Sequence, residues 1–384
     1  MSEIPFNRAS LVGNEIQNVL KAFENMHIAG DGSFTRRCHE LLEQVVGAPK
    51  ALLTTSCTHA LEMTALLLDI QPGDEVLVPS FTFVSTVNAF VLRGARPVFV
   101  DIRPDTLNLD ERLLASKTTD KTRAIVPVHY AGVGCEMEAI CRFGAERGIA
   151  IVEDNAHGLF GSYRGRKLGS FGRFSTLSFH ETKNITSGEG GALILNDPKD
   201  VERAEVIREK GTNRSQFFRG QVDKYGWVDV GSSYLPSEVL AAFLVAQLEA
   251  WQSIQQRRHA AWSRYFAELE GWANARGIAL PCVPPEAEHP AHMFYLLLPT
   301  LEARQAFIGH MWQAGIMTPF HYVPLHTSIM GRKLGYANGD LPVTESISDR
   351  LVRLPLFASI SSEELSAVVA RALAFAPPAP GRDP

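Results

Sequence analysis

Two side chains near the middle of the sequence could together perform chemistry on an amine. Lys183 follows a β-rich stretch and precedes a glycine-punctuated loop, Gly188–Gly191, so its side chain could project into a cleft. Burial lowers the pKa of a lysine and frees its amine to form an imine with an aldehyde. Taken alone, a lysine at such a position would more often be a surface residue.

Asp154 is the second of these side chains. It stands beside Glu153 at the carboxyl end of a β-rich stretch, where open α/β sheets place their ligand sites. An acidic residue there often only caps the next helix. However, a carboxylate that pairs with a pyridinium nitrogen and a lysine that holds an aldehyde as a Schiff base are the two protein groups that pyridoxal phosphate (PLP) requires. Together, Asp154 and Lys183 indicate this cofactor.

Two further segments could hold the phosphate and the ring of such a cofactor. Thr54–Ala60 is rich in hydroxyls and opens a helix, where backbone N–H groups form an anion site. An ordinary N-cap is the plainer interpretation of that segment. Pro79–Val84 offers aromatic rings that could stack on a flat heterocycle, although core packing would explain Phe81 or Phe83 equally well.

The elements that must position these residues follow an α/β pattern. Helical patterns separate the first five of seven β-rich stretches, which predicts βαβ units and a largely parallel sheet covered by helices on both faces. The tighter spacing from Phe174 onward predicts an antiparallel strand or two near the end of the sheet. The predicted strands are Ala51–Thr55, Glu75–Pro79, Pro97–Asp101, Arg123–Val128, Gly148–Glu153, Phe174–Phe179 and Ala192–Leu195.

A smaller domain is expected after Ser237–Glu249, an apolar helical segment that suits the core or a subunit interface. We assign residues 1–250, including an N-terminal helical segment, to a large cofactor domain and residues 251–384 to a small α+β domain. Trp251–Leu269 is expected to be a long helix that crosses between them. The tail Pro377–Pro384 is rich in proline and is expected to fray.

Composition and charge exclude several classes of protein. Hydrophobic residues make up 45% of the chain and charged residues 21%, which is typical of a globular protein. The length of 384 residues suits two or three domains, or one large domain with an appendage. The longest apolar stretch, Val239–Ala246, is too short to span a membrane. The formal charge of −5 argues against a nucleic-acid binder with a broad basic face. The N-terminus lacks the order of a secretory signal and the five cysteines include no CxxC pair, so we expect a soluble, cytoplasmic chain with reduced thiols.

Basic residues and histidines outside these motifs are further candidates. The segment Arg208–Lys224 carries five cations against two acids, and a solvated face is its plainer interpretation. His321 and His326 are five residues apart with a proline between them, which suits no ordinary metal pair, so we predict no metal. With His129, these two histidines could instead line the cleft near a substrate.

The chain resembles the DegT/DnrJ/EryC1/StrS sugar aminotransferases, a branch of the aspartate-aminotransferase (fold type I) superfamily. The resemblance runs from about Ile4 to Phe375. It implies an α/β fold with a three-layer α/β/α large domain, a mainly parallel seven-stranded sheet and a small α+β C-terminal domain, in a homodimer with active sites at the subunit interface. The motifs that carry it are Gly30–Phe34, Ser56–Leu61, Pro79–Phe83, Val128–Gly132, Glu153–Asp154, Ser178–Asn184, Gly188–Gly191 and His321–His326.

The resemblance also implies roles for individual residues. Lys183 would hold the cofactor and move the proton, Asp154 would sit on the pyridine nitrogen and Phe83 would stack on the ring. His157 stands where many relatives have a glutamine beside the ring oxygen, and histidine can still donate a hydrogen bond there. Ser233 stands where the wider family has an asparagine that reaches the neighbouring subunit's phosphate. The residues expected to hold the phosphate within the chain are Ser56, Cys57, Thr58 and Ser178.

Among the subgroups, the chain is most similar to dTDP-4-amino-4,6-dideoxygalactose transaminase. This similarity implies that L-glutamate aminates the C4 ketone of dTDP-4-dehydro-6-deoxy-D-glucose, in the synthesis of a cell-surface polysaccharide such as enterobacterial common antigen or O antigen. The stretches that carry it are Gly30–Cys38, Phe179–Asn184, Glu209–Tyr225 and Asp229–Tyr234. The candidates for binding this substrate are Arg36, Arg37, Arg208, Arg214, Arg219, His321 and His326.

Other functions stay open from the sequence. The ketone could belong to another sugar nucleotide or lie at C3, and the new amine could be gluco rather than galacto. Some relatives are sugar dehydratases in which histidine replaces the lysine; Lys183 argues against this class, although His180 lies nearby. A non-catalytic binding protein of the same fold is opposed by the joint presence of Asp154, Lys183 and the hydroxyl-rich turn.

Overall fold

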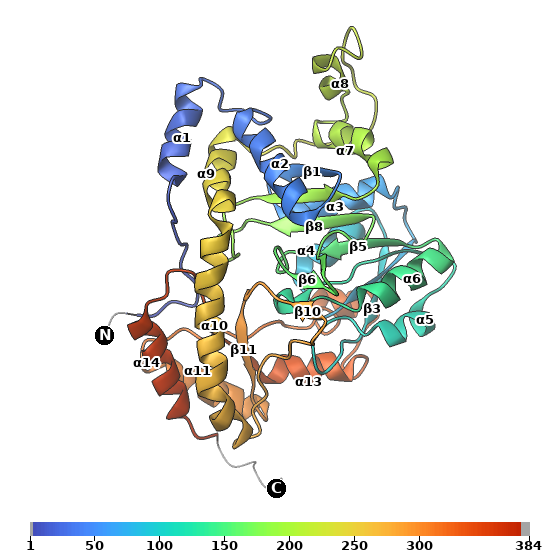
Figure 1. Cartoon of the computed structure of the whole chain (residues 1–384). Coiled ribbons are helices and arrows are strands. Elements are labelled where there is room, and N and C mark those ends of the chain that lie inside the picture. Colours follow the sequence, from blue (N-terminus) through green and yellow to red (C-terminus); the bar gives the residue numbers. More distant parts are fainter. Residues whose placement is uncertain (1–2, 378–384) are drawn as a thin grey trace.

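The structure is a computed structural model that describes residues 3–377, so the tail Pro377–Pro384 lies outside the described residues except for Pro377. A seven-stranded sheet in the order β1-β9-β8-β5-β4-β2-β3 forms the centre of the larger part (Figure 1). β9 runs antiparallel to both of its neighbours, and the remaining pairs are parallel, as predicted. The strands are β1 (Lys50–Thr54), β2 (Glu75–Pro79), β3 (Arg96–Val100), β4 (Thr122–Ile125), β5 (Ala150–Asp154), β8 (Phe174–Ser178) and β9 (Gly191–Leu195).

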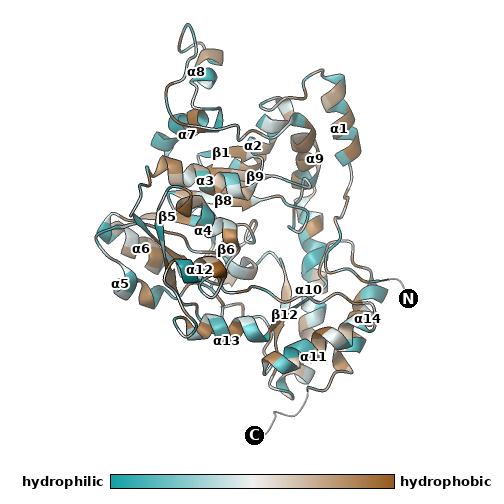
Figure 2. Ribbon diagram, turned by 180° about the vertical axis from the view of Figure 1, so that it is seen from behind, coloured by the Kyte–Doolittle hydropathy of each residue, from teal (hydrophilic) through white to brown (hydrophobic). Residues whose placement is uncertain are grey.

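Helices cover both faces of this sheet, because its strands present apolar side chains in both directions. Leu52 packs with the helices of one face, whereas its neighbours Ala51 and Leu53 pack with those of the other. Figure 2 shows apolar residues concentrated in the central strands and in α9. One face carries α3 (Cys57–Leu67), α4 (Val84–Val91) and α7 (Val201–Arg208); the other carries α2 (Ser33–Val46), α5 (Leu114–Lys117), α6 (Met137–Arg147) and α9 (Glu238–Glu249).

A second core lies in the C-terminal part of the chain. The long helix α10 (Trp251–Asn274) runs from the sheet region along this core (Figure 1), which also receives Ile4 from the N-terminal segment. The domain boundary at residue 250 stays a prediction. Ile4, although it belongs to residues 1–250, packs in the core of the C-terminal part. The other elements here are α11 (Leu301–Trp312), α12 (Ile329–Lys333), α13 (Pro342–Arg350), α14 (Ser362–Leu373) and the antiparallel pair β11 (Phe294–Leu297) and β12 (Leu351–Leu354).

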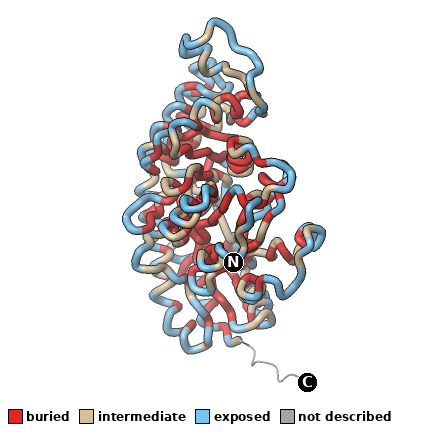
Figure 3. Tube along the Cα trace, turned by 90° about the vertical axis from the view of Figure 1, so that its right-hand side faces the viewer, coloured by how far each residue is buried: buried red, intermediate tan, exposed pale blue. Residues whose placement is uncertain are grey.

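The short and peripheral elements complete the chain. The segment around α8 (Arg214–Phe218) projects from the sheet region and is largely exposed (Figure 3). None of the helices in residues 3–377 has the length and apolarity that crossing a bilayer requires. The remaining elements are α1 (Glu15–Glu24), β6 (Ser162–Tyr163), β7 (Arg166–Lys167) and β10 (Ala287–Glu288).

Glu153 ties the end of β5 to the loop that follows it. Its fully buried carboxylate accepts hydrogen bonds from the backbone N–H groups of Gly169, Phe171 and Gly172 at 2.7–2.8 Å and lies 3.0 Å from His129 Nε2. Since side chains alternate along a strand, Glu153 points away from the face that Asp154 uses. Glu153 is therefore a structural anchor directly beside a candidate catalytic residue.

We expect Glu153→Ala to lower the free energy of unfolding by about 3 kcal/mol or more, because it leaves three backbone donors without a partner. Chemical denaturation measures this change. Glu138→Ala is the matched control: Glu138 pairs with Arg164 where both side chains are 50% exposed, so its loss should cost less than about 1 kcal/mol. Equal losses in the two variants would contradict the anchoring role of Glu153.

Candidate active site

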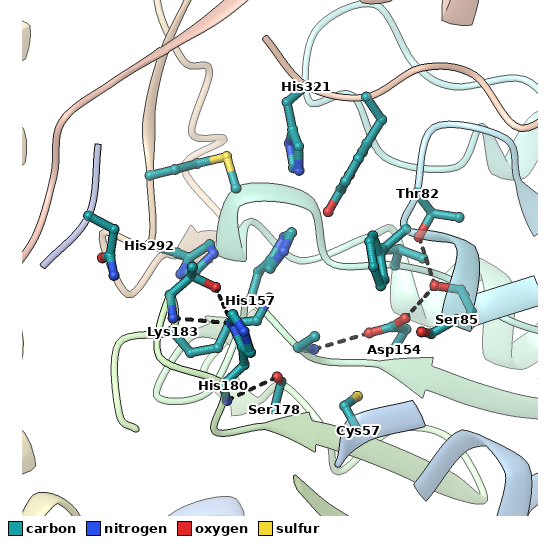
Figure 4. Close-up of a pocket in the computed structure, with 18 of the residues that line it drawn as sticks. Cys57, Thr82, Ser85, Asp154, His157, Ser178, His180, Lys183, His292 and His321 are labelled. Carbon is teal, nitrogen blue, oxygen red and sulfur yellow. Dashed lines mark hydrogen bonds between the residues drawn. The ribbon is translucent and has the colours of Figure 1, made fainter. Parts of the chain in front are cut away.

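A cavity of about 720 Å³ lies where the carboxyl ends of β1, β2, β4, β5 and β8 meet the C-terminal part of the chain (Figure 4). This is the edge at which α/β sheets bind ligands. The structure brings together nine of the residues that the sequence predicted for a site. They are Ser56, Cys57, Thr58, Phe83, Asp154, His157, Ser178, Lys183 and His321.

Lys183 lies in the loop that leaves β8, and its amine is buried in this cavity. The backbone N–H of Lys183 donates to the carbonyl of His180 at 2.9 Å, which fixes the turn. Burial lowers the pKa of Lys183 to about 8, while the nearby negative charge of Asp154 opposes the shift. A substantial share of this amine is therefore neutral near physiological pH and able to act as a nucleophile or base.

Asp154 ends β5 and is held in place by hydroxyl and backbone donors. Its Oδ2 accepts a hydrogen bond from Thr86 Oγ1 at 2.7 Å, and its Oδ1 accepts one from the N–H of Ala156 at 3.2 Å. Thr82 Oγ1 lies 2.8 Å from Thr86 Oγ1 and extends the network toward β2. The carboxylate therefore lies in the cavity with a fixed orientation, as a partner for a ring nitrogen requires.

The N-terminus of α3 forms another part of the cavity wall. Ser56 is the N-cap of this helix, since its Oγ accepts a hydrogen bond from the N–H of His59 at 3.1 Å. Thr58 Oγ1 donates to Ser85 Oγ at 2.8 Å. Gly191 on β9 lets the turn come close, because a Cβ there would meet the backbone N of Cys57 at 2.3 Å. The turn is therefore an ordinary helix N-cap, and its place in the cavity wall also suits the expected anion site.

The thiol of Cys57, which also lines this cavity, is not a reactive nucleophile. Burial raises the pKa of its thiol to about 12, and the negative charge of Asp154 adds to the effect. A thiol with such a pKa stays protonated at neutral pH and is a poor nucleophile.

Three histidines form an uncharged cluster beside Lys183. His157 stacks on His292 with ring centroids 4.4 Å apart, and His292 Nδ1 lies 2.8 Å from Asn184 Oδ1. His321 Nδ1 lies 2.9 Å from the hydroxyl of Tyr130. Burial, together with the positive charge of Lys183, holds the pKa values of all three well below the usual range of histidine. At neutral pH they act as neutral donors and acceptors in the cavity wall.

Five predicted residues lie along a second cavity of about 740 Å³ rather than in the cavity of Lys183. Arg208 is buried there and engaged, because it donates to the carbonyl of Leu53 at 2.7 Å and pairs with Asp31 at 2.8 Å. Within one chain, these residues do not reach the lysine. The five are Arg36, Arg208, Arg214, Arg219 and Ser233.

His326 and His129 do not line the cavity of Lys183, which corrects the expectation that they line the cleft beside His321. His326 is fully buried, with Nδ1 2.7 Å from Ser80 Oγ and Nε2 2.9 Å from Glu345 Oε1. His129 is also fully buried and turns toward Glu153. In both residues the ring nitrogens are occupied by internal partners, so the two histidines brace neighbouring segments. In residues 3–377, no group of three or more His, Cys, Asp or Glu side chains could hold a metal ion.

Several residues that line or support the cavity were not among those predicted from the sequence. Thr86 follows the aromatic motif by only three positions, and its contact with Asp154 could have been suspected from that proximity. His292 and Arg353 come from the C-terminal part, more than a hundred residues after Lys183, and no local motif marks them. Tyr130 lies within the family motif Val128–Gly132, but the sequence did not predict that it would support the cavity.

The residues in the cavity fit PLP. His157 lines the cavity, and its buried Nδ1 has no partner among the described residues, so it is available to a polar ligand. The N-terminus of α3 offers backbone donors for a phosphate, and Asp154 and Lys183 offer the carboxylate and amine that the cofactor requires. The fold and this site define the class of protein: a PLP-dependent aminotransferase of fold type I.

The chain belongs to the DegT/DnrJ/EryC1/StrS aminotransferase family, whose model matches residues 10–373. Two relatives illustrate the similarity over nearly the whole chain. MJ1066 of Methanocaldococcus jannaschii is 31% identical over 375 residues, which cover 96% of each chain. The spore coat polysaccharide biosynthesis protein SpsC of Bacillus subtilis (strain 168) is 30% identical over 374 residues, which cover 95% of each chain.

Solved structures agree with this assignment. The aminotransferase TlmJ from Streptoalloteichus hindustanus has a TM-score of 0.87 at 28% identity and covers 97% of this chain and 98% of its own. The PMP form of Spr1654 from Streptococcus pneumoniae has a TM-score of 0.89 at 27% identity and covers 96% of this chain and 98% of its own. Spr1654 has also been solved in a PLP form. PLP is the cofactor of this family and of this chain.

The lowered pKa of Lys183 predicts its reactivity in the protein without PLP. Since only the neutral amine is a nucleophile, acetylation of Lys183 should accelerate from about pH 7 to about pH 9 and then level off, as expected of a group with a pKa of about 8. Peptide mass spectrometry after brief exposure to an acetylating reagent measures the rate. An ordinary lysine titrates near about 10.4, so a rate that still rises steeply above pH 9 would contradict the effect of burial.

Proposed function

We propose that this protein transfers the amino group of L-glutamate to the C4 ketone of dTDP-4-dehydro-6-deoxy-D-glucose, giving dTDP-4-amino-4,6-dideoxy-D-galactose and 2-oxoglutarate. The observation that carries the reaction class is the cavity that joins Lys183, with its lowered pKa, to Asp154. The sugar nucleotide rests on the subgroup stretches of the sequence, above all Gly30–Cys38 and Glu209–Tyr225. The name of SpsC supports a role in the synthesis of a surface polysaccharide.

The residues of the cavity divide the chemistry among them. Bound PLP supplies an electron-accepting ring through which an amino group is transferred. Lys183 is the residue that takes and returns the proton, because its amine is the basic group with a pKa near neutrality in this cavity. Asp154, held by Thr86, keeps the ring nitrogen protonated. Phe83 would stack on the ring, and Ser178 with the α3 turn would hold the phosphate.

A homodimer would complete the site from two chains. Phe83 lines the cavity yet is 58% exposed in a single chain, and large apolar side chains on α1 and around α8 are also exposed, including Phe23, Phe218 and Trp227. Such surfaces favour a protein partner. In this arrangement, Ser233 and the arginines of the second cavity would serve the neighbouring chain's cavity, where the diphosphate of the sugar nucleotide needs cations.

We expect Lys183→Ala to abolish the borohydride-trapped adduct with PLP and to slow transamination by at least about 10²-fold, because the imine-forming amine and the proton carrier are both lost. Absorbance spectra and peptide mass spectrometry detect the adduct, and 2-oxoglutarate formation measures the rate. Lys167→Ala, at an exposed site outside this cavity, is the control. An unaltered protein that is colourless and forms no adduct at Lys183 would refute the proposed function.

The choice of sugar substrate is tested by incubating the protein with L-glutamate and a panel of keto sugar nucleotides. Product ring couplings measured by NMR separate galacto from gluco amines and C4 from C3 amination. A dehydrated product would instead identify a sugar dehydratase. Turnover of the dTDP-4-keto sugar to the galacto amine with the highest kcat/KM is the expected outcome.

Arg214 and Arg219 should contribute to binding of the nucleotide sugar rather than of glutamate. Arg214→Ala and Arg219→Ala are expected to raise KM for the sugar nucleotide by about tenfold and to leave KM for glutamate nearly unchanged, since each removes one cation from the diphosphate. Both side chains are accessible, and their ion pairs with Glu209 and Glu205 lie in part at the surface. Arg142→Ala, at an exposed position on α6, is the control. Equal effects on the two substrates would contradict this role.

A further inference from the structure

His292 is a buried histidine in the wall of the cavity, and its two ring nitrogens differ in what they contact. Its Nδ1 lies 2.8 Å from Oδ1 of Asn184, the residue after Lys183, and this is the one hydrogen bond that the ring makes within residues 3–377. The ring lies beside that of His157, with the centroids 4.4 Å apart, and close to Lys183 (Figure 4). Nδ1 is therefore engaged in the wall, and Nε2 is left for a ligand.

The amide of Asn184 fixes which nitrogen of His292 carries the proton. Asn184 Nδ2 donates to the carbonyl of Pro290 at 2.7 Å, so Oδ1 is the atom that faces the imidazole. An amide oxygen only accepts hydrogen bonds, and His292 Nδ1 must therefore donate. A neutral imidazole has a single ring proton, which leaves Nε2 as an acceptor with a free lone pair.

The charge state of His292 follows from its burial. Desolvation, together with the positive charges of His157 and Lys183, holds the pKa of His292 well below the usual range of histidine. The ring is therefore neutral at neutral pH, and Nε2 stays an acceptor. A carboxylate or phosphate oxygen also presents lone pairs and cannot bond to this nitrogen. A neutral donor such as a hydroxyl group suits it.

The backbone that carries His292 is held by a buried arginine of α10. Arg258 Nε donates to the carbonyl of Ala291 at 3.0 Å, and its Nη2 donates to the carbonyl of His292 at 2.6 Å. The same Nη2 donates to the carbonyl of Leu356, just after β12, at 3.3 Å. His292 is thus fixed through both its side chain and its main chain, as recognition through a single hydrogen bond requires.

The structure of the proposed substrate limits which hydroxyl would meet this nitrogen. The C4 ketone must lie beside Lys183, where the proton is moved. Of the two carbons next to this ketone in a 6-deoxyhexose, C5 carries the methyl group and C3 carries a hydroxyl. His292 is joined to the residue after Lys183 by a hydrogen bond, so its ring is close to the reacting carbon. The C3 hydroxyl is therefore the donor that best matches Nε2.

We propose that His292 Nε2 accepts a hydrogen bond from the C3 hydroxyl of the sugar and so selects keto sugars that carry a hydroxyl beside the ketone over 3-deoxy sugars. This inference rests on the proposed function, because it assumes that a sugar ketone is aminated at C4 beside Lys183. It adds to that function a residue that contacts the sugar ring rather than the diphosphate.

The test measures the binding of two sugar nucleotides that cannot be transaminated. dTDP-6-deoxy-D-galactose has a hydroxyl at C4 in place of the amine of the proposed product, and dTDP-3,6-dideoxy-D-galactose differs from it only in lacking the C3 hydroxyl. Each is titrated into the PLP-loaded protein by isothermal titration calorimetry. The difference between the two Kd values isolates the contribution of the C3 hydroxyl.

The variants separate the acceptor from the rest of the ring. His292→Phe keeps a ring against His157 but has no ring nitrogen. His292→Asn keeps an amide that can donate to Asn184 but places no acceptor at the position of Nε2. His310→Phe is the control, because His310 lies on α11 outside this cavity and its Nε2 is bonded to the carbonyl of Arg371 at 2.8 Å.

Loss of the C3 hydroxyl is expected to raise the Kd about tenfold in the unaltered protein, because a buried acceptor is left without a partner. His292→Phe and His292→Asn are expected to raise the Kd of dTDP-6-deoxy-D-galactose about tenfold and to bring the Kd values of the two sugars within about twofold of each other. His310→Phe should keep the difference of the unaltered protein. If His292→Phe does not fold, as judged by thermal unfolding, His292→Asn decides the question by the same comparison.

Equal Kd values for the two sugars in the unaltered protein would overturn the role of His292, and so would a difference that persists in a folded His292 variant. With either result, a borohydride-trapped adduct at Lys183 would leave the proposed function standing. If the adduct forms but neither sugar binds, the proposed sugar nucleotide is wrong and the role of His292 falls with it. Absence of the adduct from the unaltered protein would refute the proposed function itself.

Discussion

The site depends on keeping a lysine amine buried yet reactive. Burial removes part of the hydration of Lys183, and this desolvation lowers its pKa to about 8. The nearby carboxylate of Asp154 limits the shift, so the amine keeps part of its basicity. Burial also lowers the pKa values of His157, His292 and His321, so these side chains are uncharged at neutral pH. The lysine and the three histidines of the cavity thus have pKa values below those that they would have in water.

Glu153 and Asp154 are adjacent buried carboxylates on β5 with different partners, because successive side chains of a strand point to opposite faces of the sheet. Glu153 faces the loop below the sheet and satisfies three backbone N–H groups, whereas Asp154 faces the cavity and is held by Thr86. The strong anchoring of Glu153 fixes the strand end on which Asp154 sits. Glu153 thus anchors the strand end from which Asp154 enters the cavity.

The weak net charge of the chain is consistent with local handling of anions. In the proposed enzyme, the phosphate would be bound by the α3 turn and the diphosphate by the arginines of the second cavity. These cations lie along a separate cavity, and many of them are balanced by acids such as Asp31, Glu205 and Glu209. Separate sites let one protein bind unlike anions without a broad basic surface.

The sequence by itself determined the seven strands, the mainly parallel sheet and the candidate cofactor residues Asp154 and Lys183, because local apolar runs and motifs at strand ends are encoded over short distances. It also marked the α3 turn. Tertiary structure alone decided that His326 braces Ser80 and Glu345 instead of lining the cavity, and that His292 and Arg353 enter it. Which way a side chain faces, and which remote segment packs against it, depends on contacts across hundreds of residues that no local pattern records.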